Sequence, residues 1–211
     1  MGKMAKGLGA QTNNGSLSQN GNGSGTASQL LLFARTFAKY PNMVGWMLPS
    51  SRWVVKDVLE EVDWEKAKVI VEYGPGLGTF TTKLLERMRP DATLLALEIN
   101  PEFSRFLRGH IKDARLRLIE RSATDVGSVL ADEGFSHADY VISGIPFKTM
   151  PHELRDEIVR STHAVLRPDG RFLVYQLSSV VLPYLEDVFG TVKKDFQLLS
   201  FLPARMFYCA R

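Results

Sequence analysis

The sequence predicts one α/β domain in which a parallel sheet carries helices on both faces. After Trp64, short β-branched segments alternate with segments of helical periodicity. A cluster of glycines follows the first of these strands directly, where the chain must turn sharply into a helix. The length of 211 residues suits one domain with a sizeable core rather than two. Ligands bind such sheets beyond the carboxyl ends of the strands, so a functional site is expected there.

The strands and helices can be placed in order along the chain. Seven strands are expected, five of them at residues 68–73, 93–98, 116–120, 140–143 and 171–176, and two more between Phe196 and Cys209, on either side of Pro203. Helices are expected at residues 79–88, from Pro101 onward with Asn100 as the N-cap, and at about residues 150–166. The sequence Arg167-Pro168-Asp169-Gly170 predicts a turn before the fifth strand.

The N-terminal part has a different composition. Residues 1–28 are rich in Gly, Ser, Asn and Gln and bury too little apolar surface to offset the entropy of ordering, so this tail is expected to be disordered. Residues 29–40 have helical periodicity, with most apolar side chains on one face and the basic side chains, together with Leu32, on the other. Ser50 or Ser51 can cap a second helix that reaches about Val62. The expected organisation is therefore a tail (1–28), a helical arm (29–62) and a domain (63–211).

Charge is distributed unevenly. The first 56 residues carry six Lys or Arg and no Asp or Glu, whereas the whole chain has 26 basic and 23 acidic residues. The remainder therefore has 20 basic and 23 acidic residues and is slightly negative. A positive arm of this kind is expected to meet an anionic surface, either lipid or nucleic acid. The alternative is a merely solvated tail.

Several classes are excluded or disfavoured by composition. Cys209 is the only cysteine, so no intramolecular disulfide forms. The four histidines are not at metal-ligand spacing from one another, and no metal is expected. No apolar run approaches the roughly 20 residues that span a bilayer, and the N-terminus has no apolar core of a secretion signal. The protein is therefore expected to be soluble or peripheral.

The glycine cluster has features of a specific ligand site. Its spacing is G-x-G-x-G, from Gly74 to Gly78, and not the G-x-G-x-x-G of dinucleotide binders. Glu72 precedes the loop, where it would repel a pyrophosphate but suit an ammonium group. Glu98 ends the second strand, 24 residues after Gly74, where a carboxylate can accept hydrogen bonds from both ribose hydroxyls.

These features together resemble the S-adenosylmethionine site of class I methyltransferases. The resemblance implies a Rossmann-like sheet of seven strands and a role for Asp125, in the segment after the third strand, as acceptor of the adenine amino group. The implied cofactor residues are Ser50, Ser51, Glu72, Tyr73, Gly74, Pro75, Gly76, Gly78, Thr79, Glu98, Ile99, Asn100, Ala123, Thr124, Asp125 and Ser143. A loop of turn glycines and helix-capping acids without a ligand is the alternative interpretation.

A second motif follows the fourth strand: Ser143, Gly144, Ile145, Pro146 and Phe147. It resembles the Asn-Leu-Pro-Tyr type motif of ribosomal RNA adenine dimethyltransferases and, more closely, the equivalent loop of bacterial phospholipid N-methyltransferases. Gly144 stands where the adenine enzymes use an Asn or Asp side chain to accept hydrogens from a planar amine. An aliphatic amine needs no such help once it is deprotonated, so an ethanolamine headgroup fits better than a base. These five residues are the expected catalytic loop.

The resemblance to phospholipid N-methyltransferases covers most of the chain after the tail. It implies stepwise methylation of phosphatidylethanolamine to phosphatidylcholine by a monomer that needs no metal and lies peripherally on the cytoplasmic face of the membrane. Tyr175 and Arg205 are candidates for holding the lipid phosphate, although Arg205 also fits a surface cation. The arm is expected to contact the membrane through Leu30, Phe33, Arg35, Phe37, Lys39 and Trp46. Alternatively, its apolar side chains pack on the domain as a lid over the cofactor.

Three other functions stay open. The first is a nucleic-acid adenine methyltransferase that holds RNA with the basic arm, although Gly144 and the lack of a C-terminal helical RNA-binding domain argue against it. The second is a soluble small-molecule N- or O-methyltransferase. The third is a non-catalytic cofactor-binding or membrane-associated subunit, which the intact set of acids and glycines disfavours.

Overall fold

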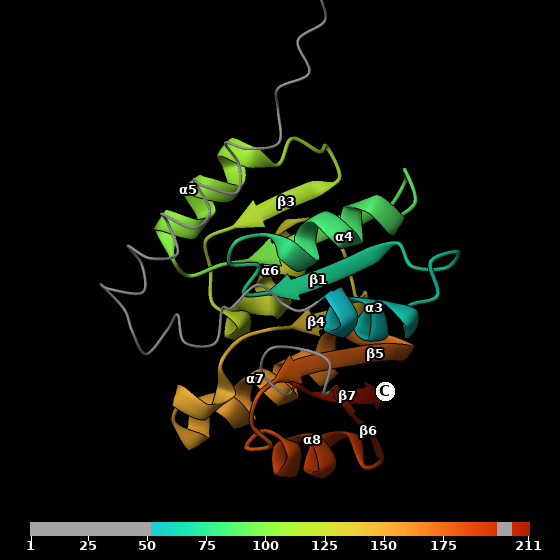
Figure 1. Cartoon of the computed structure of the whole chain (residues 1–211), viewed down its shortest axis with the longest axis vertical. Coiled ribbons are helices and arrows are strands. Elements are labelled where there is room, and N and C mark those ends of the chain that lie inside the picture. Colours follow the sequence, from blue (N-terminus) through green and yellow to red (C-terminus); the bar gives the residue numbers. More distant parts are fainter. Residues whose placement is uncertain (1–51, 198–203) are drawn as a thin grey trace, which may run out of the picture.

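The structure is a computed structural model of the chain that describes residues 52–197 and 204–211. Its described part contains a mixed seven-stranded sheet of order β3-β2-β1-β4-β5-β7-β6 (Figure 1). Within this sheet, β7 runs antiparallel to both β5 and β6, and the other neighbouring strands pair in parallel. The strands are β1 (Val69–Tyr73), β2 (Thr93–Leu97), β3 (Leu116–Ile119), β4 (Ala138–Ser143), β5 (Leu166–Gln176), β6 (Val192–Gln197) and β7 (Ala204–Ala210).

Helices cover both faces of the sheet. One face packs on α3 and α4, and the other on α6, α7 and α8. The helices are α3 (Arg52–Glu60), α4 (Thr79–Arg87), α5 (Pro101–His110), α6 (Val126–Asp132), α7 (His152–Val165) and α8 (Leu182–Phe189), with short 3-10 turns η1 (Ala123–Asp125) and η2 (Phe147–Thr149). Strands β1 and β4 are buried along their whole length, as expected of central strands covered on both faces.

Strand register brings distant segments to one edge of the sheet. Tyr73, the last residue of β1, lies beside Leu97 at the end of β2 and beside Ser143 at the end of β4. Ser143 in turn lies beside Val174, near the end of β5. The arrowheads of β1, β3 and β5 point to the same side in Figure 1. The segments that follow these strands therefore meet at one edge, as the sequence predicted.

The predicted strands β1 to β4 and the predicted helices α4, α5 and α7 are confirmed, with ends within about two residues. Of the two strands predicted between Phe196 and Cys209, the second is confirmed as β7, whereas the first lies earlier than predicted, because β6 spans Val192–Gln197. The predicted capping of α5 is also confirmed, because Asn100 accepts a hydrogen bond of 2.9 Å from the backbone N–H of Glu102. Helices α6 and α8 were not predicted. Both helices are short, with seven residues in α6 and eight in α8, and α6 also contains glycine, so neither gives a strong helical signal.

The turn at residues 167–170 needs a correction. These residues lie within β5, because Leu166 already pairs with Ala138 of β4 before the register shifts and Arg171 pairs with Tyr140. Asp169 adopts a left-handed conformation (φ +66°) in this irregular stretch. The chain thus turns locally without leaving the sheet, which a turn-like composition does not reveal.

Other predictions concern residues outside the described ranges. They are the disordered tail, the amphipathic helix at residues 29–40, the cap at Ser50 or Ser51, and Pro203. The second helix of the arm is described as α3, which begins at Arg52 and ends at Glu60. Within the described residues, no helix is long and apolar enough to cross a membrane.

Candidate active site

The glycine loop connects β1 to α4. Gly74, Gly76 and Gly78 all have left-handed backbone conformations, with φ values of +68°, +56° and +81°. At two of them a side chain would also collide with a neighbour: a Cβ on Gly74 would lie 2.8 Å from Cγ2 of Ile145, and one on Gly78 would lie 2.7 Å from Cδ2 of Leu107. The loop therefore depends on glycine for conformation and for close packing. It lies directly against the predicted catalytic loop.

Glu72 is a buried acid at the end of β1. Its side chain is 1% exposed, and its Oε2 accepts a hydrogen bond of 2.8 Å from Oγ1 of Thr81 in the first turn of α4. Its Oε1 has no partner among the described residues. Burial raises the pKa of Glu72 to about 8, and the nearby charge of Glu98 acts in the same direction, while Thr81 opposes it. A buried acceptor of this kind is stabilised by a cationic donor.

Glu98 follows β2 and is 5% exposed. Its Oε2 accepts from the backbone N–H of Gly76 (3.1 Å), and its Oε1 accepts from that of Asn100 (2.9 Å). Burial raises the pKa of Glu98, while these backbone donors lower it. The carboxylate is thus held against the glycine loop. The next residue, Ile99, is 63% exposed and presents an apolar surface beside it.

Asp125 lies beyond β3 and belongs to a capping box. Its Oδ2 accepts from the backbone N–H of Ser122 (3.2 Å), while Oγ of Ser122 accepts from the backbone N–H of Thr124 (3.3 Å). Ala123 is buried beneath this turn. The side chain of Asp125 therefore stabilises the start of the turn, in addition to the contact with adenine predicted for it.

The predicted catalytic loop begins where β4 ends. Oγ of Ser143 is buried without a partner in the described part of the chain, and the backbone N–H of Gly144 donates to the carbonyl of Tyr73 (3.2 Å). Ile145 and Pro146 are partly exposed, whereas Phe147 is fully buried in the core on the side of α6, α7 and α8. Phe147 thus anchors the loop rather than lining an open surface.

Tyr175 contacts this loop from β5. A Cβ on Gly144 would lie 2.2 Å from Oη and 2.5 Å from Cζ of Tyr175. The ring of Tyr175 stacks on Phe80 of α4, with centroids 4.1 Å apart and an interplanar angle of 15°. Phe80 is buried and follows the glycine loop by two residues. Tyr175 therefore joins the glycine loop to the predicted catalytic loop.

Tyr175 and Arg205 lie on opposite faces of the sheet. Arg205 pairs with Gln176 in the β5–β7 register, so its side chain shares a face with Gln176 and not with the adjacent Tyr175. The guanidinium of Arg205 lies over the ring of Phe196, 5.3 Å from its centroid. The two residues predicted to hold one phosphate are therefore not brought together on one face.

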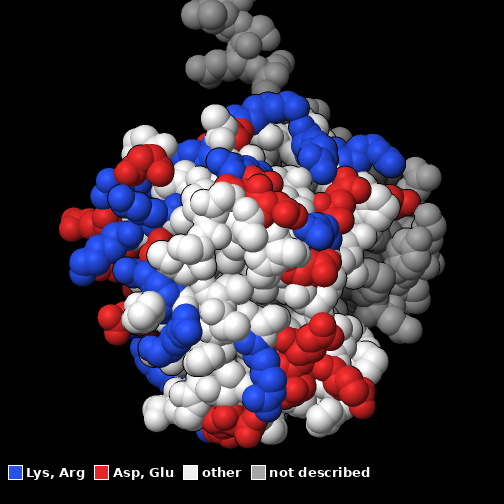
Figure 2. Space-filling view, turned by 180° about the vertical axis from the view of Figure 1, so that it is seen from behind, with Lys and Arg blue, Asp and Glu red and all other residues white. Residues whose placement is uncertain are grey.

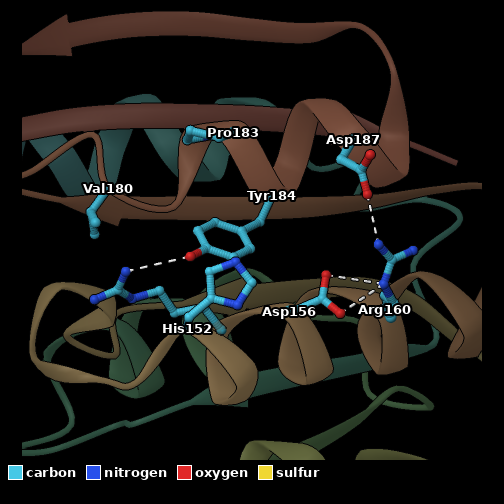
Figure 3. A pocket seen from close by; sticks show the side chains of 8 residues that line it. His152, Asp156, Arg160, Val180, Pro183, Tyr184 and Asp187 are labelled. Atoms are coloured by element: carbon cyan, nitrogen blue, oxygen red, sulfur yellow. Dashed lines mark hydrogen bonds and ion pairs between the residues drawn. The ribbon is translucent and has the colours of Figure 1, made fainter.

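Arg155 of α7 was not predicted as a site residue. Its Nε donates to the carbonyl of Phe147 (2.8 Å) and its Nη2 to that of Lys148 (3.3 Å), which fixes the end of the catalytic loop. Its Nη1 lies 3.5 Å from Oη of Tyr184, in a surface hollow of about 440 Å³ between α7 and α8 (Figure 3). Nothing in the local sequence distinguishes Arg155 from the other charged residues of α7. Its role depends on the fold.

Thr81 and Phe80 were also missed. Both lie on the buried face of α4, and only the approach of α4 to β1 and β5 shows what they contact. Ser50 and Ser51, predicted to bind cofactor, lie outside the described residues, as do all six residues predicted to contact membrane. In the described ranges, no group of three His, Cys, Asp or Glu side chains is arranged to hold a metal ion.

Comparisons with known proteins find a matching family model and similar sequences. The family model described as "Ribosomal RNA adenine dimethylase" matches residues 49–163. An ornithine lipid N-methyltransferase of Singulisphaera acidiphila is 31% identical over 180 residues, which cover 84% of this chain and 94% of that protein.

Solved structures share the fold. The N-methyltransferase NodS of Bradyrhizobium japonicum superposes with a TM-score of 0.60 at 13% identity and covers 78% of this chain and 99% of its own. A 1,6-didemethyltoxoflavin N1-methyltransferase of Burkholderia thailandensis, solved with S-adenosylhomocysteine, gives a TM-score of 0.59 at 14% identity and 92% coverage of both chains. The seven-stranded methyltransferase sheet expected from the sequence is thereby confirmed.

Proposed function

Because this chain belongs to the methyltransferase family described as ribosomal RNA adenine dimethylase, we propose that it uses S-adenosylmethionine to methylate the amine of a membrane lipid. Phosphatidylethanolamine is the proposed acceptor, with mono- and dimethyl-phosphatidylethanolamine and phosphatidylcholine as successive products. An ornithine lipid is the second candidate, because the relative from S. acidiphila bears that name.

The packing of Gly144 against Tyr175 carries this proposal. An adenine enzyme of the family needs an Asn or Asp side chain at the position that corresponds to Gly144. Here the phenol of Tyr175 occupies the space that even the Cβ of such a side chain would need. The acceptor site therefore has no side-chain group at this position to take hydrogens from a planar amine. An aliphatic amine has a localised lone pair and does not require that group.

The residues around the glycine loop fit S-adenosylmethionine. Within the described part of the chain, Oε1 of Glu72 is a buried acceptor without a partner, suited to the ammonium of the methionine part. The fixed carboxylate of Glu98 suits the ribose hydroxyls, and exposed Ile99 suits the flank of the adenine ring. When bound, S-adenosylmethionine supplies a methyl group activated by a sulfonium.

The chain contributes alignment and exclusion of water. The contact of Gly74 with Ile145 places the cofactor loop and the catalytic loop side by side, and Pro146 lies at the partly exposed side of that junction. Methyl transfer to a free amine needs no strong base, so holding the amine in line is the main requirement. The ammonium proton is released to water or to a backbone carbonyl of residues 143–146 before the amine reacts.

The lipid reaches this site from the membrane surface. We propose that the basic arm, through Leu30, Phe33, Arg35, Phe37, Lys39 and Trp46, holds the protein peripherally on the cytoplasmic face. This arm precedes α3, the first element that the structure describes. A monomer suffices, because Glu72, Glu98 and both loops come from one chain.

Nucleic acid is the less favoured acceptor. On the face shown in Figure 2, Lys and Arg are intermixed with Asp and Glu. At the β3 edge of the sheet, Arg108, Arg117 and Arg121 form ion pairs with Glu120, Glu133 and Asp132, respectively. Cations neutralised in this way add little to phosphate binding.

Expression in a bacterium that lacks phosphatidylcholine tests the proposal. Lipid extracts analysed by mass spectrometry are expected to gain phosphatidylethanolamine carrying one to three additional methyl groups, and cells with empty vector are not. Methylated ornithine lipid without methylated phosphatidylethanolamine would select the second candidate. If purified protein methylated unmodified ribosomal RNA and no lipid vesicle, the lipid proposal would be refuted.

A further inference from the structure

We propose that Oη of Tyr175 accepts a hydrogen bond from the N–H of the incoming amine and thereby orients primary and secondary aliphatic amines for methyl transfer. This inference rests on the proposed function and assigns to Tyr175 a different role from that of holding the lipid phosphate. It concerns the group that orients the nucleophile.

The position of Oη supports this assignment. It lies against the Cα of Gly144, in the middle of the loop that follows β4. The next residue, Ile145, contacts Gly74 of the cofactor loop. The phenol end therefore lies at the junction of the two loops, where the amine and the methyl group must meet. Tyr175 is partly exposed, as a residue lining an open site should be.

The ring has a fixed orientation. Phe80 is 1% exposed and stacks on it almost in parallel, and Phe80 itself is held by the first turn of α4. Fixing the ring restricts Oη to a small region beside the catalytic loop. A hydrogen-bond acceptor held in place before the substrate arrives orients it without further loss of side-chain entropy.

Gly144 and Tyr175 form a matched pair. In the adenine enzymes a side chain at position 144 supplies the acceptor, and here the phenol oxygen occupies the place where that side chain would begin. A tyrosine hydroxyl accepts as well as donates, so it can replace a side-chain carbonyl as acceptor. The hydrogen-bond acceptor is thus supplied by a residue of β5 and not by a residue of the catalytic loop.

The number of amine hydrogens makes the proposal testable. A primary amine has two N–H groups and a monomethylated amine has one, whereas a deprotonated dimethylamine has none. Oη can therefore orient the nucleophile in the first two transfers but cannot do so by this bond in the third. A purely structural role of Tyr175 would affect all three transfers alike.

The experiment compares Tyr175→Phe with the wild type on two kinds of vesicle, one containing phosphatidylethanolamine and one containing N,N-dimethyl-phosphatidylethanolamine. The variant keeps the ring and removes the oxygen. We expect kcat with phosphatidylethanolamine to fall about ten- to a hundred-fold, since one hydrogen bond to the reacting group is lost, and kcat with the dimethyl lipid to change less than about three-fold. Affinity for S-adenosylhomocysteine, measured by calorimetry, should be unchanged.

Tyr208→Phe is the matched control. Tyr208 lies in β7 on the same face of the sheet, and its hydroxyl donates to Sδ of Met206 (3.4 Å). The Tyr208→Phe variant should have the same ratio of kcat with phosphatidylethanolamine to kcat with the dimethyl lipid as the wild type. Because the ratio is measured within each variant, partial unfolding scales both rates equally and does not imitate the effect.

The outcomes separate this inference from the proposed function. A wild-type protein that methylates neither lipid refutes the proposed phosphatidylethanolamine activity. A wild-type protein that methylates both, together with a Tyr175→Phe variant that has the same rate ratio, leaves the activity standing and overturns the role of Tyr175.

Discussion

The hydroxyl of Thr81 donates a hydrogen bond of 2.8 Å to Oε2 of Glu72 and so connects the first turn of α4 to the end of β1. Both side chains are buried, and the bond leaves the other carboxylate oxygen of Glu72 without a partner among the described residues. Thr81 thus orients the acid and also favours its ionised form, because its hydrogen bond lowers the pKa of Glu72 against the effect of burial.

Replacing Thr81 by Val should weaken cofactor binding in a pH-dependent way. Without the hydroxyl, the pKa of Glu72 rises above its value of about 8, so a smaller fraction is ionised at pH 7. A cationic ligand then binds less tightly, by roughly ten-fold for one lost hydrogen bond to a charged group. Calorimetry with S-adenosylhomocysteine should show this loss at pH 7 and a smaller one at pH 9. A loss that did not change with pH would contradict the coupling.

The charge of Glu72 should lower the stability of the ligand-free protein as pH rises. Its carboxyl has an ordinary pKa of 4.5 in the unfolded chain and about 8 in the folded one. Between these values the unfolded chain releases a proton that the folded protein retains, so the free energy of unfolding falls by up to roughly 4 kcal/mol between pH 4.5 and 8. Above pH 8 the penalty is constant.

Glu72→Gln removes this pH dependence, because an amide does not ionise. The difference in free energy of unfolding between variant and wild type should therefore grow in favour of the variant from pH 4.5 to 8, as measured by urea denaturation. Glu86→Gln is the matched control, since Glu86 is an exposed acid of α4 paired with Lys83. It should give a nearly constant difference over the same range, and an equal pH slope for both variants would exclude Glu72 as the source.

The sheet could be predicted from the sequence because the pattern of strands, glycines and acids is local. The spacing of Glu72, the glycine loop and Glu98 placed all three at strand ends, and the register of β1 and β2 brings them together. The partners of these residues were not predictable in the same way. Thr81 bonds to Glu72, nine positions away in the sequence, and Arg155 bonds to the carbonyl of Phe147, eight positions away. Phe80 stacks on Tyr175, which is 95 positions away. Helices α6 and α8 were missed because tertiary packing, more than propensity, stabilises them.

Substituting Gly74 by Ala should uncouple the two loops. Alanine is strained at φ +68°, and its Cβ would lie 2.8 Å from Cγ2 of Ile145. Gly134→Ala separates these effects, because Gly134 has φ +82° and, among the residues that the structure describes, no neighbouring atom lies within 4 Å of the added Cβ. Both variants should lose about 1–2 kcal/mol of unfolding free energy through backbone strain. We expect that only Gly74→Ala also loses affinity for S-adenosylhomocysteine; equal affinities would mean that close packing of the loops is unimportant.

Arg155 should control turnover through the position of the catalytic loop. Its guanidinium donates to the carbonyls of Phe147 and Lys148, which end that loop, and the glycine loop is held separately by Glu98. Arg155→Gln is therefore expected to lower kcat with lipid vesicles roughly ten-fold while affinity for S-adenosylhomocysteine stays within about two-fold. Arg160→Gln is the matched control on α7, because Arg160 is exposed and pairs with Asp156 and Asp187 (Figure 3). Surface ion pairs of that kind contribute little, so this variant should retain wild-type kcat. Parallel losses of kcat and of cofactor affinity in Arg155→Gln would instead show that the arginine supports the whole domain and not the loop.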